Sequence, residues 1–141
     1  YMIDRLGRFV SPFPLDLGKK IVLGPAVFDF SGARKYNILV LHDDNTIRMY
    51  NLQGKVPDGW KDITSTDTIV SLPERVVSGN NSCWIVRTSR QALVFPFMGG
   101  VPLTDFSGDA MLLPSTDVSV TENGEVSAKS YNGKIQRIKI R

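Results

Sequence analysis

Residues 38–60, ILVLHDDNTIRMYNLQGKVPDGW, decide the fold of this chain. Two apolar runs flank the polar turn 43–46, and a second turn at 53–55 is followed by an aromatic residue, Trp60. Polar turn residues between two such runs are the signature of a β-hairpin. The stretch therefore predicts two short antiparallel strands and a connection that begins with a tight turn.

The pattern of this stretch returns 46 residues later in the sequence. A shift of 46 without a gap matches six pairs of residues: Ile38 with Trp84, Val40 with Val86, Ile47 with Leu93, Met49 with Phe95, Gly54 with Gly100, and Trp60 with Phe106. A shift of 47 also places Gly7 on Gly54 and Phe13 on Trp60, so a partial copy precedes the first full one. A period near 46 residues with several short strands per unit is typical of a β-propeller blade.

Three prolines mark a similar period independently. Pro25, Pro73 and Pro114 each precede a candidate inner strand, and they lie 48 and 41 residues apart. The first of these strands, residues 26–30, has the profile of a strand that is covered on both faces. Residues 9–15 contain two prolines and fit an edge strand instead. We find no helical periodicity that is free of glycine, proline or β-branched runs.

These observations predict an all-β fold made of β-propeller-type blades. We expect about three four-stranded antiparallel units in one domain: a partial blade at 1–17, blades at 18–63 and 64–110, and a partial blade at 111–141 without its outer strand. Closed propellers usually have about 4 to 8 blades, so three units predict an incomplete ring. The chain is then a fragment of a larger propeller, or two copies complete a ring. A β-sandwich built from the same strands is the alternative.

Composition narrows the classes of partner. The 17 basic and 14 acidic residues of this 141-residue chain are scattered, which is typical of a solvated surface and argues against a nucleic-acid face. We expect no transmembrane segment, since no stretch approaches the roughly 18 apolar residues that a membrane helix needs. The single cysteine, Cys83, excludes an intrachain disulfide, and its place beside Trp84 predicts a buried thiol.

His42, Asp43 and Asp44 are the first candidates for chemistry. Imidazole and carboxylate groups together can bind a metal ion or relay a proton. These three residues are consecutive at a hairpin tip, however, so their side chains diverge. His42 is also the only histidine of the chain, which excludes a site with several histidines. We interpret the three residues as an ordinary polar turn.

The tetrapeptide Asp-Phe-Ser-Gly occurs twice, at residues 29–32 and 105–108. It invites comparison with calcium loops, which need several oxygen ligands at alternate positions. Ser31 and Ala33 stand where such a loop would carry carboxylates, so we interpret both copies as turns. The sequence predicts no catalytic residue, no metal site and no cofactor.

Aromatic and basic residues offer weaker signals. Trp60, Phe13 and Phe106 occupy equivalent positions in the repeat, which favours packing between blades over stacking on sugars or bases. Four basic residues in two separate turns are weak evidence for a phosphate site. They are Lys19, Lys20, Arg34 and Lys35.

Residues 44–55 and the pair Gly59-Trp60 resemble the repeat of quinoprotein-like β-propellers, most closely the C-terminal propeller of large proteins of Bacteroidetes bacteria. Asn51 replaces the aspartate that is usual in that turn, and residues 97–100 of the second repeat lack it as well. No cofactor ligand or catalytic aspartate of the enzymatic members can be matched. The resemblance implies an exported, non-catalytic propeller that makes protein contacts in the periplasm or envelope.

The expected function is therefore that of a protein-binding or scaffold module in a bacterial envelope protein, and not of an enzyme. One alternative is a carbohydrate-binding module that uses exposed aromatic residues such as Trp84 or Tyr131. A second is a catalytic propeller whose site needs further blades, with His42 or Asp43 contributing.

Overall fold

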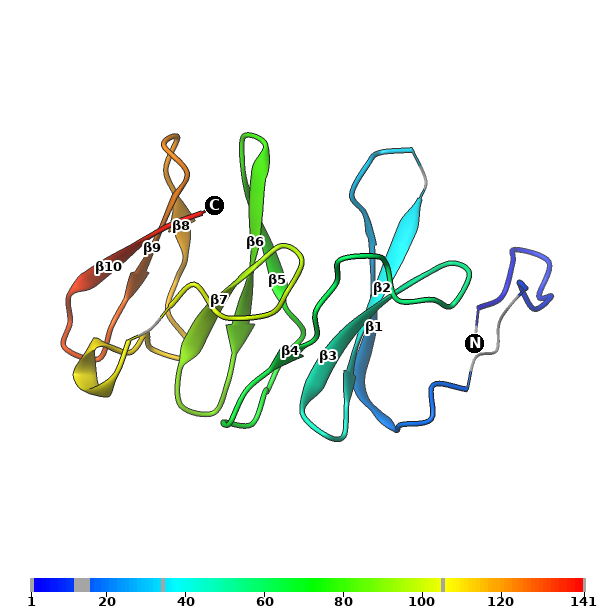
Figure 1. The fold of residues 1–141 in the computed structure, drawn as a ribbon, viewed down its shortest axis with the longest axis horizontal. Coiled ribbons are helices and arrows are strands. Elements are labelled where there is room, and N and C mark those ends of the chain that lie inside the picture. The colour runs from blue at the N-terminus through cyan, green and yellow to red at the C-terminus, as the bar shows by residue number, and fades with distance from the viewer. Residues whose placement is uncertain (1, 12–15, 34, 105, 141) are drawn as a thin grey trace.

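The computed structural model describes residues 2–11, 16–33, 35–104 and 106–140. These residues form three small antiparallel sheets that lie side by side in a row (Figure 1). The elements are β1 (Ile21–Asp29), β2 (Tyr36–His42), β3 (Thr46–Asn51), β4 (Ile63–Thr64), β5 (Glu74–Ser78), β6 (Asn81–Arg87), β7 (Ala92–Pro96), the 3-10 turn η1 (Gly108–Ala110), β8 (Ser119–Val120), β9 (Glu125–Lys129) and β10 (Ile135–Lys139).

Each sheet is a meander of strands that are consecutive in the sequence. The first sheet has the order β1-β2-β3-β4, the second β5-β6-β7, and the third β10-β9-β8. The all-β prediction is confirmed, and no α-helix occurs in the described ranges. Only the first sheet has the four strands expected of each complete unit, and the described strands do not close into a ring or barrel.

Two apolar cores hold the row together, one in each space between neighbouring sheets. We call the side of a sheet that is turned toward the next sheet in chain order its forward face and the opposite side its backward face. For the third sheet, the backward face is the side on the second core and the forward face is the other side. The first core contains the buried residues Leu39, Leu41, Ile47, Met49, Trp60, Ile63, Ile69, Trp84, Val86, Leu93 and Phe95. The second contains Cys83, Ile85, Ala92, Val94, Leu112, Val126, Ala128, Ile138 and Ile140. Because successive residues of a strand point to opposite faces, β6 and β7 supply both cores.

Main-chain hydrogen bonds also join neighbouring sheets. The amide of Lys61 donates to the carbonyl of Met98 at 2.8 Å, and the Lys61 carbonyl accepts from the Gly100 amide at 3.1 Å. Gly99 has a φ of +78°, and a Cβ atom there would lie 1.9 Å from the Lys61 carbonyl oxygen. Leu112 bridges the second and third sheets by pairing with both Ala92 and Ser130. These contacts fix how one sheet sits against the next.

The pairing registers correct the gapless repeat. Val40 pairs with Arg48 in the first sheet, whereas Val86 pairs with Leu93 in the second. The counterpart of Leu93 is therefore Arg48 and not Ile47, because the second hairpin loop is one residue shorter. The match of Met49 with Phe95 is wrong for the same reason. A slip of one residue turns a side chain to the other face, so these matched residues point in opposite directions.

The expectation that residues 26–30 form a strand covered on both faces is also wrong. Most of the segment belongs to β1, which begins at Ile21 and forms an edge of the first sheet. Val27 is 53% exposed, and only the alternate residues Phe28 and Phe30 pack against the first core. An apolar run can be an edge strand because the side chains of its inner face suffice to anchor it.

A short N-terminal hairpin stands at the end of the row beside the first sheet (Figure 1). Ile3 pairs with Phe9, and the two side chains are 56% and 62% exposed. Within the predicted edge strand 9–15, residues 12–15 lie outside the described residues, and so does Phe13. Met2 and Leu17 pack on the backward face of the first sheet, against buried Ile38, Val40 and Tyr50.

Candidate functional site

His42 is buried at the end of β2, while Asp43 and Asp44 lie exposed in the turn that follows. The Nε2 atom of His42 lies 3.2 Å from the hydroxyl oxygen of Tyr50, and its Nδ1 atom has no hydrogen-bond partner in the described structure. Asp44 forms an ion pair with Lys19 at 2.5 Å, and this contact lowers the pKa of the Asp44 carboxyl. Only the two aspartates are exposed in the turn. His42, however, is a packed residue of the sheet and not part of a surface turn.

Trp60 occupies the first core, as its place in the repeat predicts. Its indole nitrogen donates to Asp62 Oδ1 at 3.1 Å, and Asp62 forms an ion pair with Arg48 at 2.5 Å. The Arg48 guanidinium donates hydrogen bonds to the Asp62 carboxylate, which raises the pKa of the guanidinium, so that Arg48 stays charged at every working pH. Phe106 packs against the second core. These contacts give both aromatic residues a structural role.

The first copy of Asp-Phe-Ser-Gly forms a local turn. The Ser31 hydroxyl donates to Asp29 at 3.4 Å and accepts from the Ala33 amide at 3.2 Å. In the second copy, Asp105 lies outside the described residues. Over the described part of the chain, no group of three or more His, Cys, Asp or Glu side chains is placed to hold a metal ion.

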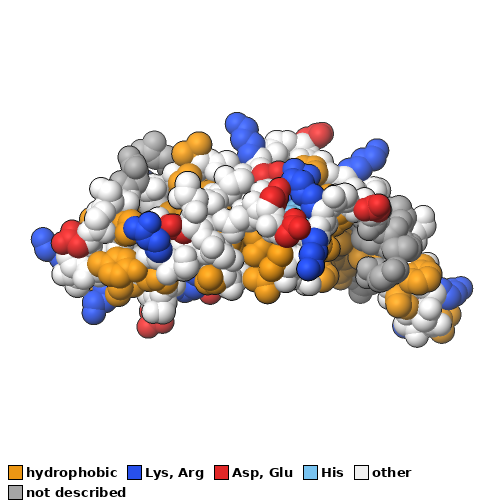
Figure 2. Space-filling model, turned by 90° about the horizontal axis from the view of Figure 1, so that it is seen from below, with side chains coloured by type: hydrophobic (Ala, Val, Ile, Leu, Met, Phe, Trp, Pro, Cys, Tyr) orange, Lys and Arg blue, Asp and Glu red, His pale blue; other side chains and the backbone are white. Residues whose placement is uncertain are grey.

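The structure adds no support for a phosphate site at the four basic residues, since Lys20 and Lys35 flank opposite ends of β1. Lys20 and Lys35 are exposed, Lys19 is engaged by Asp44, and Arg34 lies outside the described residues. On the face shown in Figure 2, basic and acidic side chains alternate. Screened charges of both signs give little attraction for a polyanion.

Trp84 is a core residue and not an exposed aromatic platform, so that part of the carbohydrate hypothesis is wrong. It is 0% exposed, and its indole nitrogen donates to the carbonyl of Phe97 at 2.8 Å. Its ring packs edge-on against Phe28 and Phe30 and stacks on Phe97. Tyr131 is 48% exposed, and its hydroxyl donates to the Arg90 carbonyl at 2.5 Å. The ring of Tyr131 is thus fixed at the surface.

The forward face of the third sheet has a different chemistry from the other two forward faces. β2 and β3 present Leu39 and Met49 there, and β6 and β7 present Ile85 and Val94. The third sheet presents polar or exposed side chains at the corresponding alternate positions. These are Ser119, Glu125, Ser127, Lys129, Ile135, Arg137 and Lys139.

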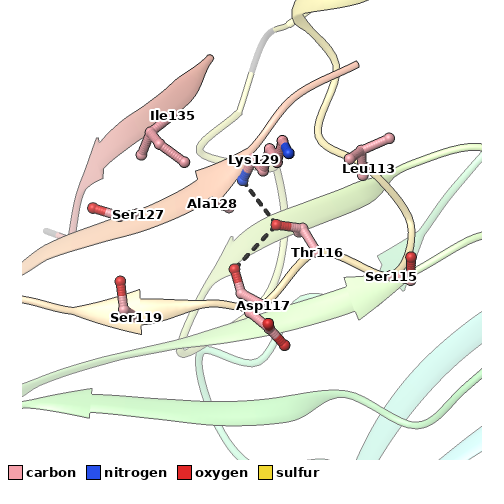
Figure 3. Close-up of a pocket in the computed structure, with 9 residues that line it drawn as sticks. All are labelled: Leu113, Ser115, Thr116, Asp117, Ser119, Ser127, Ala128, Lys129 and Ile135. Atoms are coloured by element: carbon pink, nitrogen blue, oxygen red, sulfur yellow. Dashed lines mark hydrogen bonds between the residues drawn. The ribbon is translucent and has the colours of Figure 1, made fainter. Parts of the chain in front are cut away.

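A hollow of about 520 Å³ lies over this face (Figure 3). Its lining residues are Leu113, Ser115, Thr116, Asp117, Ser119, Ser127, Ala128, Lys129 and Ile135. Buried Thr116 shapes one wall, since its hydroxyl accepts from the Lys129 amide at 2.8 Å and donates to the Asp117 carbonyl at 3.0 Å. The hollow thus offers hydroxyl groups, one ammonium and one carboxylate, which suits hydrogen bonding to another molecule.

The sequence predicts an inner strand after Pro114 but not this hollow. A signal was present: in 117–120 and again in 125–129, polar residues alternate with valine or alanine. Val126 and Ala128 enter the second core, so the polar residues between them must face away from it. Strict alternation in two neighbouring strands indicates a sheet with one solvated face.

Comparison with protein-family models, with curated proteins and with solved structures found no match to this chain. Among the described residues, none of the helical structure has the length and apolar character that crossing a bilayer requires. The chemistry of the hollow therefore has to be interpreted from its own residues.

Proposed function

We propose that this chain is a β-propeller-type segment that serves as a protein-binding or scaffold module, without catalysis, in an extracytoplasmic protein of the bacterial envelope. The row of three antiparallel sheets packed face to face supports the propeller-type architecture over the β-sandwich, which has two facing sheets. The envelope location rests on the resemblance of residues 44–60 to quinoprotein-like propellers.

One observation carries the binding role: the forward face of the third sheet is hollowed and hydroxyl-lined, where the two preceding forward faces are apolar and covered. Polar rims with several hydrogen-bonding groups are ordinary components of protein interfaces. A partner protein that donates and accepts hydrogen bonds would match this face.

Capture from an envelope extract tests the proposal. The immobilised chain is expected to retain a defined protein partner, identified by mass spectrometry, and Ser127→Arg should abolish its capture by filling the hollow. Ser89→Arg introduces the same side chain at an exposed turn outside the third sheet and is the matched control. Equal capture by both variants would remove the hollow from the binding surface.

Carbohydrate binding is the second candidate, and the half-exposed ring of Tyr131 is the observation that favours it. Aromatic rings that are fixed at a surface can stack on sugar rings. Glycan-array binding by the wild-type chain that disappears in Tyr131→Ala, with an unchanged melting temperature, would favour this function. The catalytic alternative loses support, since His42 is 0% exposed.

A further inference from the structure

A hollow of about 620 Å³ lies at one end of the first sheet, where β2 begins and β3 ends. Its lining residues are Lys35, Tyr36, Asn37, Asn51, Leu52, Gln53, Pro57 and Asp58. All eight belong to the first sheet or to the loops beside it, so a single sheet builds the hollow. Both sides of this sheet are occupied, because Met2 and Leu17 pack on its backward face and Trp84 of the second sheet packs on its forward face. The volume is in the range of about 300–1,000 Å³ that small-molecule sites have.

Hydrogen bonds hold the loop on one side of this hollow in a fixed shape. The side-chain oxygen of Asn51 accepts from the amides of Gln53 at 2.9 Å and Lys55 at 3.0 Å. The main-chain amide of Asn51 donates to the Lys55 carbonyl at 2.8 Å. Because both side-chain bonds end on the oxygen, and no described residue accepts from the Nδ2 atom, that nitrogen can still donate two hydrogen bonds. A bound molecule would thus meet a donor that is already oriented, which lowers the cost of binding.

The other polar side chains that line the hollow have no hydrogen-bond or ion-pair partner among the described residues. They are Lys35, Tyr36, Asn37, Gln53 and Asp58. The amide groups of Asn37 and Gln53 can each donate and accept hydrogen bonds, which matches a hydroxyl group that also does both. The ammonium of Lys35 and the carboxylate of Asp58 cancel in charge, so the lining favours a neutral ligand over an anion such as phosphate.

Apolar surface accompanies these polar groups. The ring of Tyr36 is 39% exposed, and Leu52 and Pro57 are half-buried in the same lining. A sugar ring presents apolar C–H groups on its faces and hydroxyl groups around its rim. The faces suit an aromatic ring, whose body is apolar, and the rim suits amide side chains. The lining thus carries both kinds of group that a saccharide needs.

The second sheet shows that the fold does not require the pair of amides. Asn37 pairs with Asn51 in the first sheet, and the register places Cys83 and Pro96 at the same level of the second. Cys83 is 0% exposed and belongs to the second core. The same position is therefore filled by apolar packing in one sheet and by two uncharged polar side chains in the other. A role in binding explains the amides, whereas strand pairing does not.

We propose that this hollow binds a neutral saccharide. Its hydroxyl groups would pair with the side-chain amides of Asn37, Asn51 and Gln53, and one face of the sugar ring would pack on Tyr36. The inference goes beyond the proposed protein-binding function. It also names a site apart from Tyr131, which lies in the turn between β9 and β10 of the third sheet.

A glycan array that carries neutral and acidic oligosaccharides, followed by an NMR titration, tests the proposal. We expect the chain to bind neutral oligosaccharides, and the one that binds best is then added to the isotope-labelled chain. The side-chain amide signals of Asn37, Asn51 and Gln53 should shift, because these groups would contact the sugar. Asn37→Leu keeps a side chain of similar size without the amide and should weaken binding about tenfold. Tyr36→Ala removes the ring and should weaken binding at least about fivefold.

Asn123→Ala is the matched control, since Asn123 is exposed in the turn before β9, and it should leave binding unchanged. Circular dichroism melts show whether each variant is folded, and Gln53→Ala, at an exposed position of the hollow, replaces a variant that is not. Binding to acidic glycans alone, or to none, would overturn the proposal. Neutral-glycan binding that Tyr131→Ala abolishes and Asn37→Leu leaves intact would overturn it too. Ser127→Arg should leave sugar binding unchanged, so this inference and the proposed protein-binding function fail separately.

Discussion

At the scale of single residues, the residue type alone does not show whether a side chain is buried or exposed. Trp84 and Tyr131 are both aromatic, yet one is 0% exposed and the other 48%. The sequence placed Cys83 in the interior correctly, because it stands in an apolar run next to a tryptophan. It could not place His42, since a histidine at the end of a strand can face either the solvent or the sheet.

Trp84→Ala is expected to lower the free energy of unfolding by about 3–5 kcal/mol, the usual cost of emptying a large aromatic site in a core. Trp84→Phe keeps a ring but leaves the Phe97 carbonyl without its donor, so about 1–2 kcal/mol is expected. Urea denaturation followed by circular dichroism measures both values. A stability close to wild type for Trp84→Ala would contradict the assignment of this residue to the first core.

Burial raises the pKa of Cys83 from 9.0 to about 11. The native thiol keeps its proton between these values, whereas the unfolded thiol loses it, so stability is fully present below pH 9 and falls as the pH rises toward 11. The expected loss at pH 10 is about 1.4 kcal/mol, since pH 10 lies one unit above the unfolded pKa and one pKa unit corresponds to about 1.4 kcal/mol. Urea denaturation at pH 7 and pH 10 measures it. Cys83→Ala should lack this part of the pH dependence, and an identical slope in that variant would refute the assignment.

At the scale of elements, turns could be predicted from the sequence and exact registers could not. The hairpin around Asn132-Gly133 forms between β9 and β10 as its turn residues indicate. The loop between β6 and β7 is tighter than the alignment assumes, because the Thr88 hydroxyl accepts from the amides of Arg90 and Gln91 and closes the turn early. Repeat spacing alone does not contain that information, so the gapless repeat matches Leu93 and Phe95 with residues that point to the opposite face.

The contact between the first two sheets gives a prediction at this scale. Gly99→Ala should destabilise the chain by at least about 2 kcal/mol more than Gly133→Ala, in the range of other steric substitutions in packed positions. Both glycines have a left-handed φ, +78° and +82°, but a Cβ atom at Gly99 meets the Lys61 carbonyl oxygen, whereas none of the described atoms lies within 4 Å of one at Gly133. Thermal melts of the two variants give the difference. Equal melting temperatures would show that the two sheets can move apart at Gly99 and Lys61 without a loss of stability.

At the scale of the whole molecule, the row of sheets has two unlike ends. The backward face of the first sheet has an apolar cluster that carries Met2 and Leu17, whereas the forward face of the third sheet carries Glu125, Lys129 and Arg137. Head-to-tail closure of two copies into a ring would remove these charges from water, which is costly without exact partners. The all-β class and the repeat could be predicted from the sequence. The polarity of each face could not, because it depends on the register of strand pairing.

Light scattering coupled to size exclusion should therefore give the mass of a monomer, 15.7 kDa, at micromolar concentration. Replacing Lys129 and Arg137 together by leucine makes the end face of the third sheet apolar and should cause association that grows with concentration. The double variant Lys20→Leu, Lys55→Leu changes two exposed residues outside this face and is expected to remain monomeric. A dimeric wild-type chain would favour ring closure instead.

The main-chain hydrogen bonds of Lys61 and Leu112 between neighbouring sheets should make the row resistant to shear. Side-chain cores alone would allow neighbouring sheets to slide, because dispersion forces have little directional preference. Hydrogen bonds between the backbones of adjacent sheets oppose such shear, since a shift of a single residue breaks them. A force applied along the row would thus be borne both by these hydrogen bonds and by the segments that connect the sheets. The row is therefore expected to keep the arrangement of its sheets when it is pulled along its length.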